Sequence, residues 1–130
     1  MAKRGILQAG GLAAVPHDHI LMVYLSNKDK DEKEFDVEPW DTEALKLQGR
    51  LFRGATSYPA RGSYRKSDAR GEIVDEGVML ESTRMVQSFI READFTEESL
   101  KAVSEFMLRF KKATNQDSVG MVVDGEFYYL

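Results

Sequence analysis

Two helical segments lie among four strand-like segments in this chain, and their order restricts its fold more than any other feature. Along the sequence the segments are strand, helix, strand, strand, helix and strand, followed by a hairpin extension. Two β-α-β halves in this order form the ferredoxin-like plait, an α+β fold (βαββαβ) whose antiparallel sheet has two helices on one face. We therefore expect a plait with a C-terminal hairpin, built from residues 19–26, 40–52, 55–66, 78–90, 94–115 and 119–130.

The local sequence signals support these assignments. Residues 19–26 (HILMVYLS) form a continuous apolar run, which is typical of a central strand buried on both faces. Proline and glycine within residues 55–66 indicate an edge strand with a bulge. Asp124 and Gly125 predict a tight hairpin turn. The second helix is capped by Asp94 or Thr96, and its apolar stripe consists of Leu100, Val103, Phe106, Met107 and Phe110.

Residues 78–90 alternate in a way that separates two faces of a strand. Because both helices of a plait cover the same face of the sheet, the other face is polar, covered by a partner or used for binding. We place Met79, Glu81, Thr83, Met85, Gln87 and Phe89 on this open face, and Val78, Leu80, Val86 and Ile90 on the other.

Length and composition predict one ordinary domain. The chain has 130 residues and a net charge of −4, and it contains no cysteine, which excludes disulfides and thiolate chemistry. No apolar stretch approaches the length of about 20 residues that a transmembrane helix needs. We expect residues 1–18 to be a flexible or loosely ordered leader and residues 19–130 to be the domain, with the cytoplasm as the default location.

Several short motifs together resemble those of a family of small uncharacterised bacterial proteins. The motifs are Gly62-x-Tyr64-Arg65, Gly71-x-Ile73, Glu81-x-Thr83-Arg84, Arg109-Phe110 and Gln116-x-x-Val119. The resemblance covers about residues 21–124 and implies the plait fold, but no established activity. The chain departs from the family's pattern by an insertion at 75–80, a longer connection at 113–115, and Tyr64 where a tryptophan is expected.

Charge is segregated along the sequence. Residues 29–43 contain eight acids, whereas residues 46–70 contain seven basic residues and one acid. Such a basic segment on an acidic protein can bind phosphate or carboxylate groups, and interleaved tyrosines can stack on bases. Alternatively, the arginines neutralise the neighbouring acids, which we favour. The candidate binding residues are Arg53, Arg61, Tyr64, Arg65 and Arg70.

Glu81 is the candidate catalytic residue. It lies in the middle of an apolar strand, where a half-buried carboxylate can act as an acid or base. Equally, it can form a structural ion pair with Arg53 or Arg65, which is the interpretation we prefer.

Two further motifs have simpler explanations. His17-Asp18-His19 offers two imidazoles for a partial metal site, but without a third ligand at a supporting spacing we expect no metal there. Residues 23–27 resemble the first ribonucleoprotein motif of RNA-recognition domains. The companion octapeptide of those domains is missing, so a core strand with one tyrosine is the simpler interpretation.

Three functional hypotheses remain. The first, which we favour, is a non-enzymatic interaction module that forms a homodimer through the open sheet face or the C-terminal hairpin. The second is a protein that binds an anionic ligand or nucleic acid through residues 46–70. The third is a small-molecule enzyme that uses Glu81 with Tyr64 and Arg65. No cofactor-binding or phosphate-binding motif is present, so we expect no cofactor.

Overall fold

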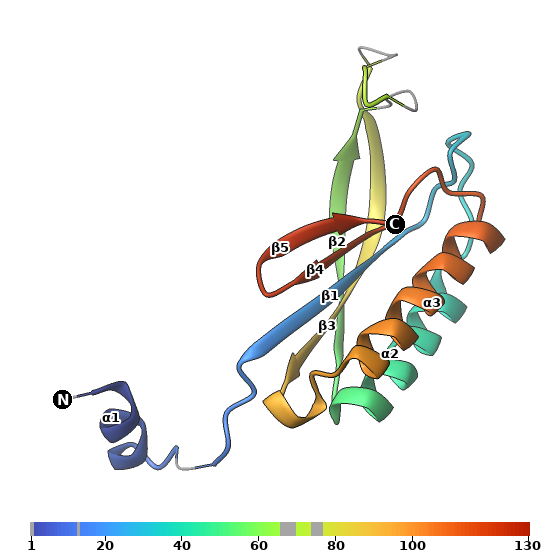
Figure 1. The fold of residues 1–130 in the computed structure, drawn as a ribbon. Coiled ribbons are helices and arrows are strands. Elements are labelled where there is room, and N and C mark those ends of the chain that lie inside the picture. Colours follow the sequence, from blue (N-terminus) through green and yellow to red (C-terminus); the bar gives the residue numbers. More distant parts are fainter. Residues whose placement is uncertain (1, 13, 66–69, 74–76) are drawn as a thin grey trace.

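The computed structural model describes residues 2–12, 14–65, 70–73 and 77–130, which form an α+β fold (Figure 1). Its five-stranded antiparallel sheet has the order β2-β3-β1-β4-β5. The strands are β1 (His19–Ser26), β2 (Thr56–Tyr64), β3 (Met79–Ile90), β4 (Gly120–Val123) and β5 (Glu126–Tyr129). The helices in the described residues are α1 (Lys3–Ala9), α2 (Glu38–Phe52), α3 (Glu97–Ala113) and the short 3₁₀ helix η1 (Glu92–Asp94).

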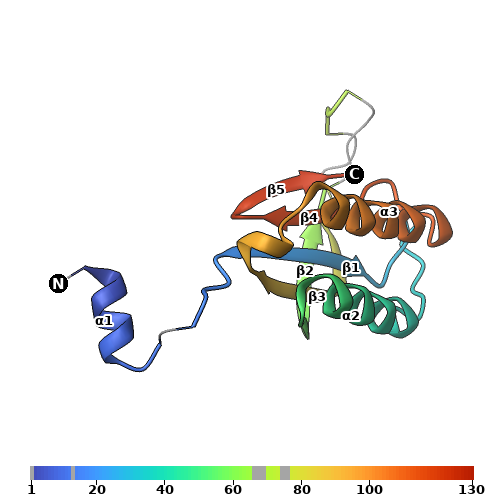
Figure 2. The ribbon, with the colours of Figure 1, turned by 60° about the horizontal axis from the view of Figure 1, so that its bottom comes forward.

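The first four strands have the order that a plait predicts, but the complete sheet is not that of a plain ferredoxin plait. The predicted hairpin places β5 beside β4, so a fifth strand extends the sheet. Asp124 and Gly125 have φ angles of 50° and 83°, which is the left-handed conformation that a tight hairpin turn needs. Helices α2 and α3 lie together on one face of the sheet, as expected, while α1 lies apart from it (Figure 2).

The core lies between the sheet and these two helices. Leu21, Val23 and Leu25 of β1 are fully buried against this layer, together with Phe106 and Phe110 of α3. The intervening residues of β1 are only partly buried. The prediction that β1 is buried on both faces is therefore wrong, because helices cover only one face of its sheet.

The edge position predicted for β2 is confirmed, but the predicted bulge is wrong. Residues Thr56 to Tyr64 pair with Gln87 to Met79 without a break in register. Pro59 is accommodated opposite Arg84, because an edge strand has one side on which a missing N–H disrupts no ladder. Lys66 and the first two residues of the predicted insertion at 75–80 lie outside the described residues.

The ends of the helices follow the sequence closely. The Thr96 side chain caps α3 by accepting a hydrogen bond from the Ser99 N–H at 3.1 Å. Asn115 takes a left-handed conformation just after α3, with φ of 57°. Helix α2 begins at Glu38, two residues earlier than expected, with a proline in its first turn.

The N-terminal segment contains α1, none of whose residues is buried. This helix and the chain that joins it to β1 extend away from the sheet (Figure 1). The loose order predicted for residues 1–18 stays a prediction. No helix in the described part of the chain is long and apolar enough to cross a membrane.

Candidate functional site

A cavity of about 460 Å³ opens on the side of the sheet that the helices leave uncovered. Its walls come from β1, β2, β3, the β4–β5 hairpin and the connection between α3 and β4. The open face predicted for β3 contributes Met79, Glu81, Thr83 and Met85. The volume lies within the range of about 300–1,000 Å³ that is usual for small-molecule sites.

Glu81 is the half-buried carboxylate on the β3 side of this cavity. Its Oε2 accepts a hydrogen bond from the Ser26 hydroxyl at 2.7 Å. The predicted link between Glu81 and Arg53 is wrong, because Arg53 pairs with Asp94 at 2.8 Å. Arg53 precedes β2, whereas Glu81 lies opposite Gly62 near the other end of that strand.

Three aromatic side chains form a second part of the lining, which we call the aromatic wall: Tyr24, Phe127 and Tyr129. The Phe127 ring makes edge contacts with Tyr24 and Tyr129, at centroid distances of 5.5 and 4.8 Å. Phe127 also lies directly on Gly120, where an added Cβ atom would be only 2.5 Å from the ring. The wall therefore depends on a glycine in the neighbouring strand.

Tyr64 lies at the end of β2 and also lines the cavity. Burial raises the pKa of its phenol above the usual value, and the negative charge of Asp117 raises it further. Tyr64 is consequently a neutral hydroxyl group at ordinary pH, able to donate or accept a hydrogen bond.

The other predicted binding residues are spread over the molecule. Arg61 is exposed and lines the cavity. Arg65 and Arg70 are exposed beyond the end of β2 and are not among the residues that line the cavity. Arg53 lies at the opposite end of β2. The structure thus brings Glu81 and Tyr64 to one face of the sheet, whereas Arg61, which pairs with Ser82, lies on the other face of β2. Anion or nucleic-acid binding by the whole set stays a prediction.

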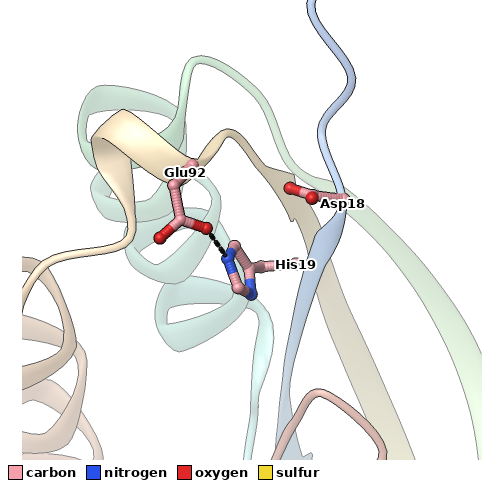
Figure 3. Close-up of side chains that lie close together, drawn as sticks. All are labelled: Asp18, His19 and Glu92. Carbon is pink, nitrogen blue, oxygen red and sulfur yellow. Dashed lines mark hydrogen bonds and ion pairs between the residues drawn. The ribbon is translucent and has the colours of Figure 1, made fainter.

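His19 lies in a second cluster, at the start of β1 (Figure 3). Its Nε2 is 2.5 Å from Glu92 Oε2, and its Nδ1 is 2.7 Å from Asp124 Oδ2. The ring stacks on Phe95 at a centroid distance of 3.9 Å. One ligand atom from each of Asp18, His19 and Glu92 lies within 4.8 Å of the others. Because carboxylates already engage both ring nitrogens of His19, we interpret the cluster as an ionic clamp and assign no metal to it.

The clamp predicts a stability that decreases at alkaline pH. The hydrogen bonds from Glu92 and Asp124 raise the pKa of His19 from 6.5 to about 9. Protonated His19 therefore stabilises the fold fully below about pH 6.5, and this contribution is lost as the pH rises through 9. His19→Gln should remove the decrease in melting temperature between pH 7 and 10.

His17→Gln is the matched control, because the His17 ring is bonded to a backbone carbonyl of β3 rather than to acids. This control should retain the decrease seen in the wild-type protein. Equal melting curves of the wild type and His19→Gln across this pH range would contradict the ionic clamp.

Sequence reasoning missed several residues of the site. Tyr24 was noted only in an RNA-binding motif, and Phe127 and Tyr129 only as part of the hairpin. The spacing of Phe127 and Tyr129 by two residues in β5 was the signal that these two share a face. Tyr24 lies in β1, and its contact with Phe127 depends on the order of the strands in the sheet. Ser26 gave no signal, because its contact with Glu81 depends on the pairing of β1 with β3.

Comparison with protein-family models and with curated proteins finds no match. Solved structures of a phage SAM lyase do match. The complex with S-methyl-5'-thioadenosine has a TM-score of 0.63 and 14% identity, covering 88% of this chain and 90% of that chain. The structure of the apo state has a TM-score of 0.57 and 13% identity, covering 87% of this chain and 88% of that chain. The likeness extends over nearly the whole of both chains, and it shows a common fold. The resemblance to a bacterial family stays an interpretation of the motifs.

Proposed function

We propose that this protein binds S-adenosylmethionine in the cavity of the open sheet face and cleaves it as a lyase. The phage protein of the same fold is a SAM lyase, whose structure was solved in complex with S-methyl-5'-thioadenosine. This likeness favours the small-molecule enzyme hypothesis over an interaction module. Homodimerisation stays a prediction.

The observation that supports the proposal most strongly is the placing of Glu81 and the aromatic wall around one cavity. S-adenosylmethionine carries a positive sulfonium group, which a carboxylate attracts. The faces of aromatic rings also attract cations, by about 0.5–2 kcal/mol depending on how far the cation is desolvated. Glu81 therefore supplies the negative charge of the site, and the wall supplies its apolar surface.

The likeness to a SAM lyase is the basis of the proposed reaction class. As the bond between the sulfonium sulfur and the methionine γ-carbon breaks, an oxygen of the substrate's own carboxylate bonds to that carbon, the electron pair of the broken bond stays on sulfur, and neutral S-methyl-5'-thioadenosine leaves. A lyase adds no water, so the remaining four-carbon fragment is one water lighter than homoserine. In this account Glu81 holds the sulfonium, and the wall orients it for cleavage.

Calorimetry with three ligands tests the binding part of this proposal. We expect S-adenosylmethionine to bind at least about tenfold more tightly than S-adenosylhomocysteine, which has a neutral sulfur in place of the sulfonium. S-methyl-5'-thioadenosine should also bind, because it keeps the nucleoside. Glu81→Gln should reduce the preference for the sulfonium. No binding of any of the three ligands, or equal affinity for the charged and neutral ones, would contradict the proposal.

A further inference from the structure

We propose that Ser26 is the positioning residue of the site, because it holds one oxygen of Glu81 and thereby directs the other into the cavity. This inference rests on the proposed function and adds to it a residue that does not itself need to touch the ligand. The evidence for this role is the contacts of the Glu81 carboxylate with Ser26 of β1 on one side and with Gly62 of β2 on the other.

Ser26 holds the carboxylate from the β1 side. Its hydroxyl lies 2.7 Å from Glu81 Oε2 and 3.3 Å from the Lys28 carbonyl oxygen. A hydroxyl has one proton to donate, and the shorter contact, to a charged acceptor, is the stronger one. The Lys28 backbone N–H donates to the same hydroxyl oxygen at 3.2 Å, which orients the proton toward Glu81.

The turn that follows Ser26, at Asn27 and Lys28, is itself held by hydrogen bonds. The Lys28 ammonium donates to the Leu80 carbonyl oxygen at 2.8 Å, next to Glu81 in β3. Gln116 donates its side-chain N–H to the Lys28 carbonyl oxygen at 2.9 Å. The Asn27 N–H donates to the Ser82 carbonyl oxygen at 2.9 Å. Ser26 is therefore set in a fixed frame formed by β3 and by the connection between α3 and β4.

Gly62 leaves room for the carboxylate on the β2 side. Glu81 is paired with Gly62 in the sheet, and a Cβ atom at position 62 would lie 3.3 Å from Oε1 and 3.4 Å from Cγ. Oε1, the oxygen that Ser26 does not hold, thus lies next to a residue that has no side chain. In the described part of the chain, Ser26 is the hydrogen-bond donor that the structure gives to Glu81.

Among the described residues, the carboxylate is consequently held by a hydrogen bond at one oxygen and receives none at the other. A sulfonium ligand gains most from a charge that does not have to reorient when the ligand binds or reacts. Without Ser26, the side chain of Glu81 can rotate among its rotamers, and part of its effect on the ligand is lost. Ser26 is therefore expected to act through Glu81 alone.

The experiment measures kcat, KM and S-adenosylmethionine affinity in Ser26→Ala and Ser26→Thr, each made with and without Glu81→Gln. Ser26→Ala should lower kcat/KM by about tenfold, the usual loss for a hydrogen bond to a charged group. Ser26→Thr, which retains the hydroxyl, should recover most of this loss. In the Glu81→Gln background, Ser26→Ala should cause no further loss, because two residues that act as one unit are not additive.

A second measurement needs no ligand. The side-chain carboxyl carbon of Glu81 should shift in the ¹³C spectrum of Ser26→Ala and return toward its wild-type position in Ser26→Thr. The matched control is Ser82→Ala, because Ser82 is the exposed neighbour of Glu81 and lies on the other face of β3. This control should leave the Glu81 resonance and the kinetics unchanged.

The outcomes separate the two proposals. An unmoved Glu81 resonance in Ser26→Ala overturns the positioning role, whatever the ligand is. Wild-type kinetics of Ser26→Ala, or an equal loss with and without Glu81→Gln, also overturn it. A wild-type protein that neither binds nor cleaves S-adenosylmethionine overturns the proposed function, while the ¹³C shift still decides whether Ser26 holds Glu81.

Discussion

Glu81→Gln should lower the kcat/KM for S-adenosylmethionine cleavage by about 100-fold or more. Glutamine has nearly the same shape and can still accept the Ser26 hydrogen bond, so the substitution removes the charge and little else. Misplacing a substrate by about 1 Å, or removing one preorganised polar contact, typically costs a factor of about 100 in rate. The measurement is the initial rate of S-methyl-5'-thioadenosine release as a function of substrate concentration.

The matched control for this prediction is Glu105→Gln. Glu105 is exposed on α3, which lies on the opposite face of the sheet from the cavity. Its substitution removes the same charge and should leave the rate unchanged. Both variants should melt within a few degrees of the wild type, so a loss of rate reports on the site. A wild-type rate for Glu81→Gln would show that Glu81 takes no part in the reaction.

Gly120→Ala should weaken both the fold and the ligand site. The new Cβ would lie 2.5 and 2.9 Å from two ring atoms of Phe127, which is closer than side chains approach one another. The ring must move, and overpacking of this kind typically costs about 1–3 kcal/mol. Because the same ring contacts Tyr24 and Tyr129, the aromatic wall should lose its arrangement, and affinity for S-adenosylmethionine should fall by about tenfold.

Gly49→Ala is the matched control for this substitution. Gly49 lies within α2, and an added Cβ there would meet nothing within 4 Å. Alanine in a helix is about 0.5–1 kcal/mol more favourable than glycine, so this variant should be more stable than the wild type. Urea unfolding and calorimetry check both variants. A Gly120→Ala protein with wild-type stability and affinity would contradict the role assigned to Phe127.

Local sequence patterns predicted the elements of this fold well. The apolar stripe of α3, its Thr96 cap and the Asp124-Gly125 turn depend on neighbouring residues, and the structure confirms all three. The alternation of β3 also correctly placed Glu81 on the uncovered face. The fifth strand of the sheet was foreseen as a hairpin, because its turn chemistry is local.

The predictions that were wrong concern features that depend on contacts between distant segments of the chain. The continuous apolar run of β1 predicted burial on both faces, but only one face is buried. Burial of the second face depends on whether helices cover it, and the local sequence of β1 does not indicate this. The same limit explains the missed contact between Ser26 and Glu81, which follows from the register of β1 with β3. Arg53 was assigned to the wrong partner because η1 brings Asp94 to it.

The most direct test of the account is to incubate the purified protein with S-adenosylmethionine and to analyse the products by liquid chromatography and mass spectrometry. We expect S-methyl-5'-thioadenosine to accumulate together with a four-carbon fragment one water lighter than homoserine, and Glu81→Gln to suppress both. Intact substrate after prolonged incubation with folded wild-type protein would contradict the central claim that the cavity is the active site of a lyase.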